Sequence, residues 1–481
     1  FLATGGSVVS LKNCLFSSVN WVLYCSDTIC RAEQVTVHNS DYFGLPNDGG
    51  GSELYVTNSL LVAVTNVNLD LLFVTNNTVT LVTDVGVFQA GGAGAHYLAT
   101  NSPYRNAGTT SIDATLLASL KKKTTYPPVI LTNTISTNTT LSPQAQRDTG
   151  TPDLGYHYDP IDYWTSCTIS NATVTLTNGV VAAYYRNPGF WMRENAKLLS
   201  TGSPLARNFI VYFSGVQEQS LVLDPTGLGQ VLPINPNHTN QVIHPELSLN
   251  FTTMVAPQGA NYLLYKGDSN WEFQRFELRN CELFGGNAYV YFYGGLTNAS
   301  YQLINNLFEY LNVGIDLDIA TPATLVARNN LFRNSLGGVE IANWGSEVWH
   351  TKDNVFDGIE FYIDGDASHN AYVNGAYPYS SIQSNDVIAT NFMWVAGPLG
   401  NYYQLSTNLL SQGSQTADLA GLYHYTVLTN LSGGLQFKET DSVVDIGYHY
   451  VAVDLTGNPI DSDGDAVPDQ AEDKNGNGQF D

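Results

Sequence analysis

The sequence predicts an all-β chain that folds as a parallel β-helix, in which successive coils stack their strands and turns. One phrase recurs at a fixed spacing: LINNLF ends at Phe308, ARNNLF at Phe332 and TKDNVF at Phe356, 24 residues apart each time. Repeats of roughly 20–50 residues indicate stacked structural units. These repeats contain period-2 strands and Gly or Asn turns, with no helical period. Only 13% of residues are charged, and 29 Tyr and 20 Phe suit strands.

Asn and Phe have separate predicted roles in the repeat. Asn tolerates left-handed backbone angles at sharp turns between strands. Asn side chains that stack from coil to coil, about 4.8 Å apart, form hydrogen-bonded ladders. We expect the Phe residues to stack in one interior column.

Residues 1–90 repeat the phrase less regularly, through LKNCLF, VHNSDY, VTNSLL and VTNNTV. In this part we expect the turns to be headed by Asn13, Asn39, Asn58 and Asn76. Residues 91–162 are rich in turn residues, but Asp113–Lys123 has the pattern of a short helix with Leu116, Leu117 and Leu120 on one face.

A six-residue cassette, DLGYHY at 153–158, recurs as DIGYHY at 445–450. The recurrence predicts two β-helix modules in tandem, residues 1–162 and 163–453, followed by an acidic tail at 454–481. We interpret His157 and His449 as parts of an aromatic clasp that closes a coil, with metal ligation as the alternative.

Charge and cysteine usage limit the possible partners. The chain has 43 acidic and 19 basic residues, a net charge of −24, which argues against nucleic acid and favours divalent cations. Cys14 and Cys281 are predicted to be small core residues, while Cys25 and Cys30 leave a local disulfide open, if the compartment is oxidising. No apolar run approaches the about 18 residues of a membrane span, so we predict no membrane insertion. Phe1 opens in mid-pattern, which indicates a mature or trimmed start.

The tail has the spacing of a calcium-binding loop. With Asp461 as position 1, carboxylates stand at positions 1, 3, 5, 9 and 12 and a backbone carbonyl at position 7, although Gly464 is at position 4 rather than 6. A second half-site follows it directly. The predicted calcium ligands are Asp461, Asp463, Asp465, Val467, Asp469 and Glu472, then Asp473, Asn475, Asn477 and Asp481.

The tail resembles thrombospondin type-three and dockerin-like calcium repeats, and the text of residues 1–90 and 270–390 resembles the pectate-lyase-like β-helix superfamily. Together, the cassettes and the tail are similar to large uncharacterised secreted β-helix-repeat proteins of bacteria. The resemblance implies a right-handed helix and an extracellular or cell-surface location.

Three functions remain open. An outward column of Asp316, Glu340 and Glu360 is a weak catalytic candidate for a polysaccharide lyase or glycosidase, because pectate-lyase relatives use such a face. The same face is a candidate for binding extracellular polysaccharide, as in an adhesin. Unpaired strand edges favour a third function, head-to-tail association of the chain with itself. We favour this last function, a calcium-stabilised structural protein of an extracellular filament or surface layer.

Overall fold

The computed structural model describes residues 2–481, with gaps at 4–5, 47–50, 69–71, 185–188, 219–233, 241, 257–261, 267–271, 294–295, 320–321, 336, 379–381 and 406. Contacts divide the chain into two compact units that interleave in the sequence. Unit 1 comprises Phe1–Ile130, Gln144–Trp164 and Val216–Leu221, and unit 2 comprises Leu131–Pro143, Thr165–Gly215 and Val222–Asp481.

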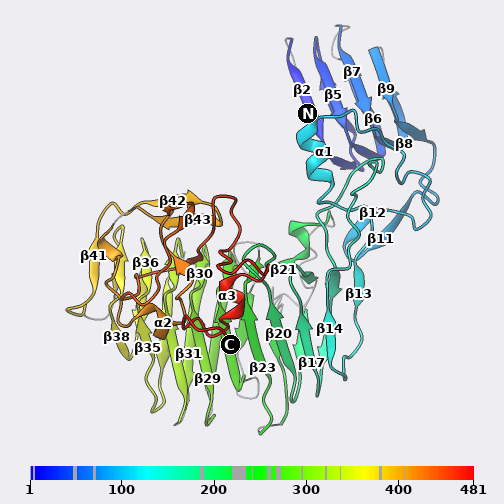
Figure 1. Ribbon diagram of the computed structural model, residues 1–481. Coiled ribbons are helices and arrows are strands. Elements are labelled where there is room, and N and C mark those ends of the chain that lie inside the picture. Colours follow the sequence, from blue (N-terminus) through cyan, green and yellow to red (C-terminus); the bar gives the residue numbers. More distant parts are fainter. Residues whose placement is uncertain are drawn as a thin grey trace. The chain divides into compact units, whose positions relative to one another are not determined.

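Three long parallel ladders form most of unit 2, and the division between the units falls within β13 and β15 of the first ladder (Figure 1). The first is β13 (Val129–Leu131), β15 (Tyr163–Thr165), β18 (Val181–Tyr184), β21 (Asn208–Tyr212), β24 (Thr252–Val255), β27 (Glu282–Phe284), β30 (Leu307–Glu309), β33 (Leu331–Arg333), β36 (Val355–Asp357), β39 (Ala371–Val373) and β41 (Val387–Ala389). The second is β14 (Thr139–Leu141), β17 (Thr173–Leu176), β20 (Lys197–Thr201), β23 (Glu246–Asn250), β26 (Arg275–Arg279), β29 (Ser300–Ile304), β32 (Thr324–Arg328), β35 (His350–Lys352) and β38 (Asp366–Ser368). The third is β16 (Cys167–Ile169), β19 (Phe190–Met192), β22 (Ile234–Pro236), β25 (Tyr262–Lys266), β28 (Asn287–Tyr293), β31 (Asn312–Asp318), β34 (Val339–Asn343), β37 (Glu360–Ile363) and β40 (Tyr377–Pro378).

Unit 1 has two shorter parallel ladders. One contains β1 (Leu2–Ala3), β3 (Leu15–Ser17), β4 (Trp21–Cys25), β6 (Thr36–Pro46), β8 (Leu60–Asn68) and β10 (Val79–Leu81). The other contains β2 (Val8–Lys12), β5 (Ile29–Glu33), β7 (Glu53–Thr57) and β9 (Leu72–Asn76). The prediction of an all-β chain with stacked parallel strands is confirmed, and the order of the strands is compatible with a parallel β-helix.

Each unit adds short elements to its ladders. In unit 1 these are the hairpin β11 (Phe88–Gly91) and β12 (Gly94–Leu98), and α1 (Ala114–Leu120). In unit 2 they are η1 (Phe213–Gly215), β42 (Trp394–Gly397), β43 (Gly400–Gln404), η2 (Thr407–Leu409), α2 (Ala417–Ala420), β44 (Tyr425–Thr426), β45 (Leu431–Ser432), β46 (Leu435–Gln436), β47 (Tyr450–Val451) and α3 (Asp469–Glu472). The predicted helix at 113–123 is confirmed as the shorter α1, whose first turn is capped because Asp113 accepts from the amide of Leu116 at 2.8 Å.

The predicted Phe column is confirmed. Phe308, Phe332 and Phe356 are in register on neighbouring strands, and their rings stack at centroid distances of 4.7 and 5.2 Å with planes 7° and 8° apart. All three side chains are buried. The fixed spacing in the sequence therefore reports direct side-chain stacking.

The paired Asn residues of the repeat divide two tasks between them. The second of each pair forms the predicted ladder, since Asn306 donates to Asn330 at 3.0 Å and Asn330 donates to Asn354 at 2.8 Å. Cys281 occupies the same position one repeat earlier, where its amide donates to Asn306 at 2.9 Å and its side chain is fully buried. It is the small core residue that the sequence predicts.

The first residue of each pair adopts the left-handed conformation, and we call the set of these residues the corner column. In unit 2 its members are Asn280, Asn305, Asn329 and Asp353, with φ between 53° and 62°. In unit 1 they are Asn13, Gln34, Asn58 and Asn77, which follow β2, β5, β7 and β9 directly. The predicted turn positions Asn39 and Asn76 are therefore wrong, because Asn39 bends the long strand β6 and Asn76 is the last residue of β9.

The cysteines show no disulfide. Cys25 and Cys30 are both buried as thiols, and all five cysteines lie in the described part of the chain. Burial, with a smaller contribution from the neighbouring Cys25, raises the pKa of Cys30 to about 12, so this thiol stays protonated at neutral pH.

The two cassettes bind the corner column in the same way. In unit 1, Asn13 donates to the carbonyl of His157 at 2.9 Å and accepts from the His157 amide at 2.8 Å. In unit 2, Asn305 donates to the carbonyl of His449 at 2.9 Å and accepts from its amide at 2.7 Å. The Tyr after this His stacks on a tyrosine of a hairpin. The ring centroids of Tyr158 and Tyr97 are 4.1 Å apart in unit 1, and those of Tyr450 and Tyr403 are 4.4 Å apart in unit 2.

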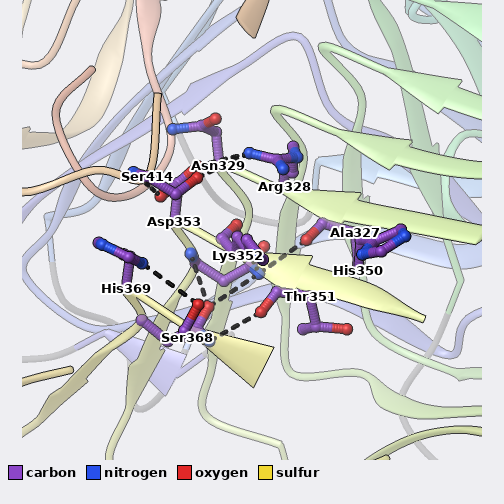
Figure 2. Close-up of polar contacts among 12 residues, drawn as sticks. Ala327, Arg328, Asn329, His350, Thr351, Lys352, Asp353, Ser368, His369 and Ser414 are labelled. Carbon is purple, nitrogen blue, oxygen red and sulfur yellow. Dashed lines mark hydrogen bonds and ion pairs between the residues drawn. The ribbon is translucent and has the colours of Figure 1, made fainter. Parts of the chain in front are cut away.

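Further contacts extend each cassette along its column. The amide of Gly155 donates to the carbonyl of Asn58 at 2.8 Å, and the amide of Gly447 donates to that of Asp353 at 2.9 Å. The buried Asp353 carboxylate also accepts from Arg328 at 3.0 Å and from the Ser414 hydroxyl at 2.8 Å (Figure 2). The amides of Asn58 and Asp353 already donate to the next coil, and the cassette satisfies the carbonyls of these two corner residues.

The two cassettes neutralise their buried acid differently. In unit 1, Arg105 lies 3.3 Å from Asp153. In unit 2, burial and then the charge of Glu439 raise the pKa of Asp445, the equivalent residue, to about 7. Burial alone would lower the pKa of His449. The hydrogen bond to Glu439 at 3.0 Å outweighs burial, so the pKa of His449 is raised. The cassette carboxylate is therefore balanced by a bound proton in unit 2 and by the charge of Arg105 in unit 1.

This difference predicts opposite effects of matched substitutions. The folded state binds the Asp445 and His449 protons more tightly than the unfolded state, so stability falls as the pH rises through about 7. Asp445→Asn keeps the neutral form, and we expect it to raise the free energy of unfolding at pH 8 by about 1–2 kcal/mol and to flatten its dependence on pH. Asp153→Asn instead removes the counter-ion of buried Arg105 and should cost about 3 kcal/mol. Urea denaturation of both variants at pH 5 and pH 8 measures this, and a stabilising Asp153→Asn or a destabilising Asp445→Asn contradicts it.

Candidate calcium site

The acidic tail is folded and packs on residues that precede it in unit 2. The amide of Tyr423 donates to the carbonyl of Gly476 at 3.2 Å, and within the tail the amide of Asp469 donates to the carbonyl of Ile460 at 2.9 Å. Residues 461–467 form a first loop, α3 follows it, and residues 473–481 form a second loop. Figure 1 shows α3 in red.

The backbone of the first loop wraps around its own carboxylates. Asp461 accepts from the amides of Gly464 and Ala466 at 2.7 and 2.9 Å. Asp463 accepts from the amide of Asp465 at 3.2 Å, and Asp465 from that of Val467 at 2.8 Å. As a result, one carboxylate oxygen from each of Asp461, Asp463 and Asp465 lies within 4.8 Å of the other two.

Glu472 lies near this group, although its carboxylate is not among the oxygens that lie within 4.8 Å of one another. Its Oε2 atom is buried and has no hydrogen-bond partner among the described residues. Burial and then the charges of Asp463 and Asp465 raise the pKa of Glu472. Hard cations of the size of Ca²⁺ take 6–8 oxygens, and a bidentate Glu at position 12 typically closes the site. An unsatisfied carboxylate oxygen beside three convergent aspartates fits such an ion.

Asp469, the predicted ligand at position 9, has other partners. Its carboxylate accepts from the Ser462 amide at 2.6 Å, from the Ser462 hydroxyl and from the ammonium of Lys438. Lys438 thereby links the loop to the strand region before it. Nothing in the local sequence pattern points to Lys438, because the contact spans 31 residues.

The second loop repeats the backbone pattern of the first. Asp473 accepts from the amides of Gly476 and Asn477 at 2.8 and 3.0 Å, and Asn475 accepts from the amide of Asn477 at 3.0 Å. The Asp481 carboxylate closes the loop on Asn475 at 2.9 Å. His424 lies 3.0 Å from Asp473, another contact that spacing does not reveal.

Both loops need the left-handed conformation at two equivalent positions. Gly464 and Ala466 have φ of 78° and 76°, and Gly476 and Gly478 have 74° and 83°. The left-handed conformation costs a residue with a Cβ about 1–2 kcal/mol, so Ala466 is the strained member. In the second loop glycine is also a packing requirement, since a Cβ on Gly476 would lie 2.2 Å from the carbonyl oxygen of Gly421.

The predicted column of outward acids is wrong. Glu340 is in register with Gly314 and Tyr362, whereas Asp316 is in register with Ala342. The cause is a turn: Val339 follows Phe332 by seven residues, but Val313, its register partner, follows Phe308 by five. Because the turn before β34 is two residues longer, Glu340 pairs with Gly314 and not with Asp316, which lies two residues further along β31.

The acids therefore lie on a diagonal, each opposite a small or aromatic residue, with Glu360 opposite Tyr377. This arrangement avoids like charges directly across neighbouring strands, which are destabilising. Burial raises the pKa of Asp316, and burial followed by the charge of Asp316 raises that of Glu340. The indole nitrogen of Trp344 donates to Asp316 at 3.2 Å.

The fold and these loops define an all-β protein of stacked parallel sheets with a folded acidic tail. No protein-family model, curated protein or solved structure matches the chain. Within the described residues, no helix has both the length and the apolar character needed to cross a bilayer.

Glu472 provides a direct test of the site. Glu472→Gln removes a charge at the unsatisfied oxygen, and we expect calcium affinity to fall about 10- to 100-fold. Asp441→Asn removes one charge from an exposed residue outside the loops and should leave the affinity unchanged. Isothermal titration calorimetry with CaCl₂ measures both. Equal affinity in Glu472→Gln and the unsubstituted chain would exclude Glu472 as a ligand.

Proposed function

We propose that the chain is a secreted, calcium-stabilised structural protein whose parallel strands form a right-handed, pectate-lyase-like solenoid. Two modules in tandem, each closed by a cassette, account for the matching contacts of His157 and His449 with the corner column. An extracellular or cell-surface location follows from the resemblance of the cassettes and the tail, and from the millimolar calcium that weak extracellular sites use.

Calcium is the cofactor in this proposal, and one observation carries it: the carboxylates of Asp461, Asp463 and Asp465 converge within 4.8 Å. The buried Oε2 of Glu472, which has no hydrogen-bond partner among the described residues, feels their charges. These four acids repel one another without a cation. Asp469 and Val467 complete the predicted set of the first site, and Asp473, Asn475, Asn477 and Asp481 that of the second. The ion holds the two ends of the first loop together.

Self-association is proposed through the last strands of unit 2. In the strand order, β38, β40 and β41 each have one neighbour among the described strands. Tyr377 of β40 and Ile388 of β41 are exposed by 67% and 62%. Open strand edges with apolar side chains are templates for pairing with another chain, and a head-to-tail contact that does not close a ring produces a filament.

Electron microscopy with and without a chelator tests this proposal. We expect filaments or sheets at millimolar calcium, dispersed particles after chelation, and a melting temperature that falls on chelation by several degrees. Ile388→Lys should prevent assembly without changing the melting temperature of the calcium-loaded particle, because it places a charge on the open edge. The matched control is Leu419→Lys, at an exposed position on α2 that is not part of these strands. Monodisperse particles at millimolar calcium, with no effect of Ile388→Lys, argue against assembly.

Polysaccharide binding is the second candidate, and the outer face of β31, β34 and β37 favours it. Trp344 is 63% exposed, and it donates to Asp316 beside Glu340. An exposed indole next to hydrogen-bonding carboxylates suits the apolar face and the hydroxyl groups of a sugar. The raised pKa values also keep a lyase or glycosidase open as a variant of this candidate.

A glycan array separates the candidates. Binding that Trp344→Ala abolishes and Trp21→Ala leaves intact supports the polysaccharide candidate, because Trp21 is a comparably exposed tryptophan elsewhere, at 56%. Release of reducing or unsaturated sugar from a bound glycan assigns enzyme activity. If no glycan binds, the polysaccharide candidate is excluded for the glycans on the array and the structural proposal is retained.

A further inference from the structure

A pair of histidines joins β6 to the hairpin of unit 1. His38 of β6 and His96 of β12 approach with Nδ1 of the first 2.9 Å from Nε2 of the second. Phe88 of β11 packs against both rings, at centroid distances of 5.3 and 5.1 Å. The side chain of His96 is 5% exposed and that of His38 is 18% exposed, so the pair lies just under the surface.

Each ring has a carboxylate at its outer nitrogen. His96 Nδ1 lies 2.7 Å from Glu218 Oε1, and His38 Nε2 lies 3.5 Å from Asp84 Oδ2. Glu218 is held in place by the Tyr158 hydroxyl at 2.9 Å and by the amide of Ala95 at 2.7 Å. The four side chains form a continuous row: carboxylate, imidazole, imidazole, carboxylate.

The hydrogen bonds determine where the protons are. Glu218 accepts, so His96 carries its proton on Nδ1 and its Nε2 accepts from Nδ1–H of His38. Burial, and then the proximity of His96, lower the pKa of His38. In this arrangement of hydrogen bonds each ring carries one proton.

We propose that His38 Nδ1 and His96 Nε2 bind a divalent transition metal ion of the zinc or copper class. Imidazole nitrogens suit these ions, and two nitrogens on a tetrahedral zinc lie roughly 3.3 Å apart, at bond lengths of about 2.0–2.1 Å. To admit the ion, the observed separation of 2.9 Å widens by a few tenths of an ångström, and the rings turn so that both nitrogen lone pairs point at the ion. Water fills the remaining coordination positions from the exposed side of His38.

The outer carboxylates give the pair the environment of metal-binding histidines. Ligating histidines commonly donate their second N–H to a carboxylate, which fixes the tautomer and raises ligand basicity. Glu218 already accepts from His96 in this way. When the ion binds, the proton leaves Nδ1 of His38 and one is taken up at Nε2, where Asp84 accepts it. The ring changes tautomer, and no net proton is released.

Unit 2 has the same framework with a different pair. Tyr402 occupies the place of His96, since its amide donates to the hydroxyl of Tyr450 at 3.3 Å as that of His96 donates to Tyr158 at 3.0 Å. Glu309 occupies the place of His38, because each follows its left-handed corner residue by four positions. The Tyr402 hydroxyl donates to Glu309. The framework therefore does not require histidine, and the pair in unit 1 is a chemical specialisation.

Calorimetric titration of the full chain with ZnCl₂, in excess calcium to saturate the acidic loops, tests the proposal. We expect one zinc ion at micromolar affinity, and with Cu²⁺ an electron paramagnetic resonance spectrum with coupling to two nitrogens. The double variant His38→Glu, His96→Tyr installs the pair of unit 2 and should abolish binding. His350→Ala removes an exposed histidine and should leave binding unchanged.

Two further variants separate a metal site from a structural hydrogen bond. Glu218→Gln and Asp84→Asn keep both ligands, and we expect each to weaken zinc about 10- to 100-fold. Zinc should also raise the melting temperature of the unsubstituted chain but not of the double variant. The proposal is overturned if zinc fails to bind at millimolar concentration, or if the double variant binds it as tightly as the unsubstituted chain. Should the double variant not fold, an unchanged affinity in both Glu218→Gln and Asp84→Asn overturns it instead.

Discussion

The reciprocal pair of hydrogen bonds between a left-handed asparagine and the backbone of a cassette is the contact on which each unit depends. A left-handed residue turns the chain sharply between strands, and its amide still donates to the next coil, as those of Asn13 and Asn305 do to Glu33 and Arg328. Its side chain is thereby free to bind a segment outside the coil. Asn13 and Asn305 satisfy the amide and carbonyl of a residue 144 positions later, in both cases a cassette histidine. Local turn geometry is thereby coupled to a distant segment, and the corner column is covered along its length.

The sequence predicted those parts of the fold in which identical residues recur at identical spacing. The Phe column and the Asn ladder followed from three copies of one phrase, because stacked side chains must keep register. The outward acids were predicted wrongly, since two extra residues in the turn before Val339 displace β34 while leaving the phrase itself intact. Asn76 was wrong for a related reason, as two consecutive Asn residues leave the position of the turn undetermined by one residue.

The loop of the tail shows a second limit of sequence reasoning. The convergence of Asp461, Asp463 and Asp465 was predictable, because their spacing is the one that calcium-binding loops use. The partners of Asp469 and Asp473 were not, since Lys438 and His424 come from segments with no pattern of their own. The histidines that join β6 to the unit 1 hairpin escaped notice similarly, because His38 and His96 stand 58 residues apart and meet only through the hairpin.

The Asn ladder has a consequence for how such a chain changes over evolutionary time. Asn306, Asn330 and Asn354 succeed one another by 24 residues, yet the next member, Asn370, follows after only 16 and still accepts from Asn354 at 3.1 Å. Seven of the eight missing residues come from the connections and one from a strand, since β37 has four residues where β34 has five. A gene of this kind can therefore lengthen or shorten by whole repeats, or trim its loops, while a frame-preserving deletion inside a strand breaks the register of everything stacked on it.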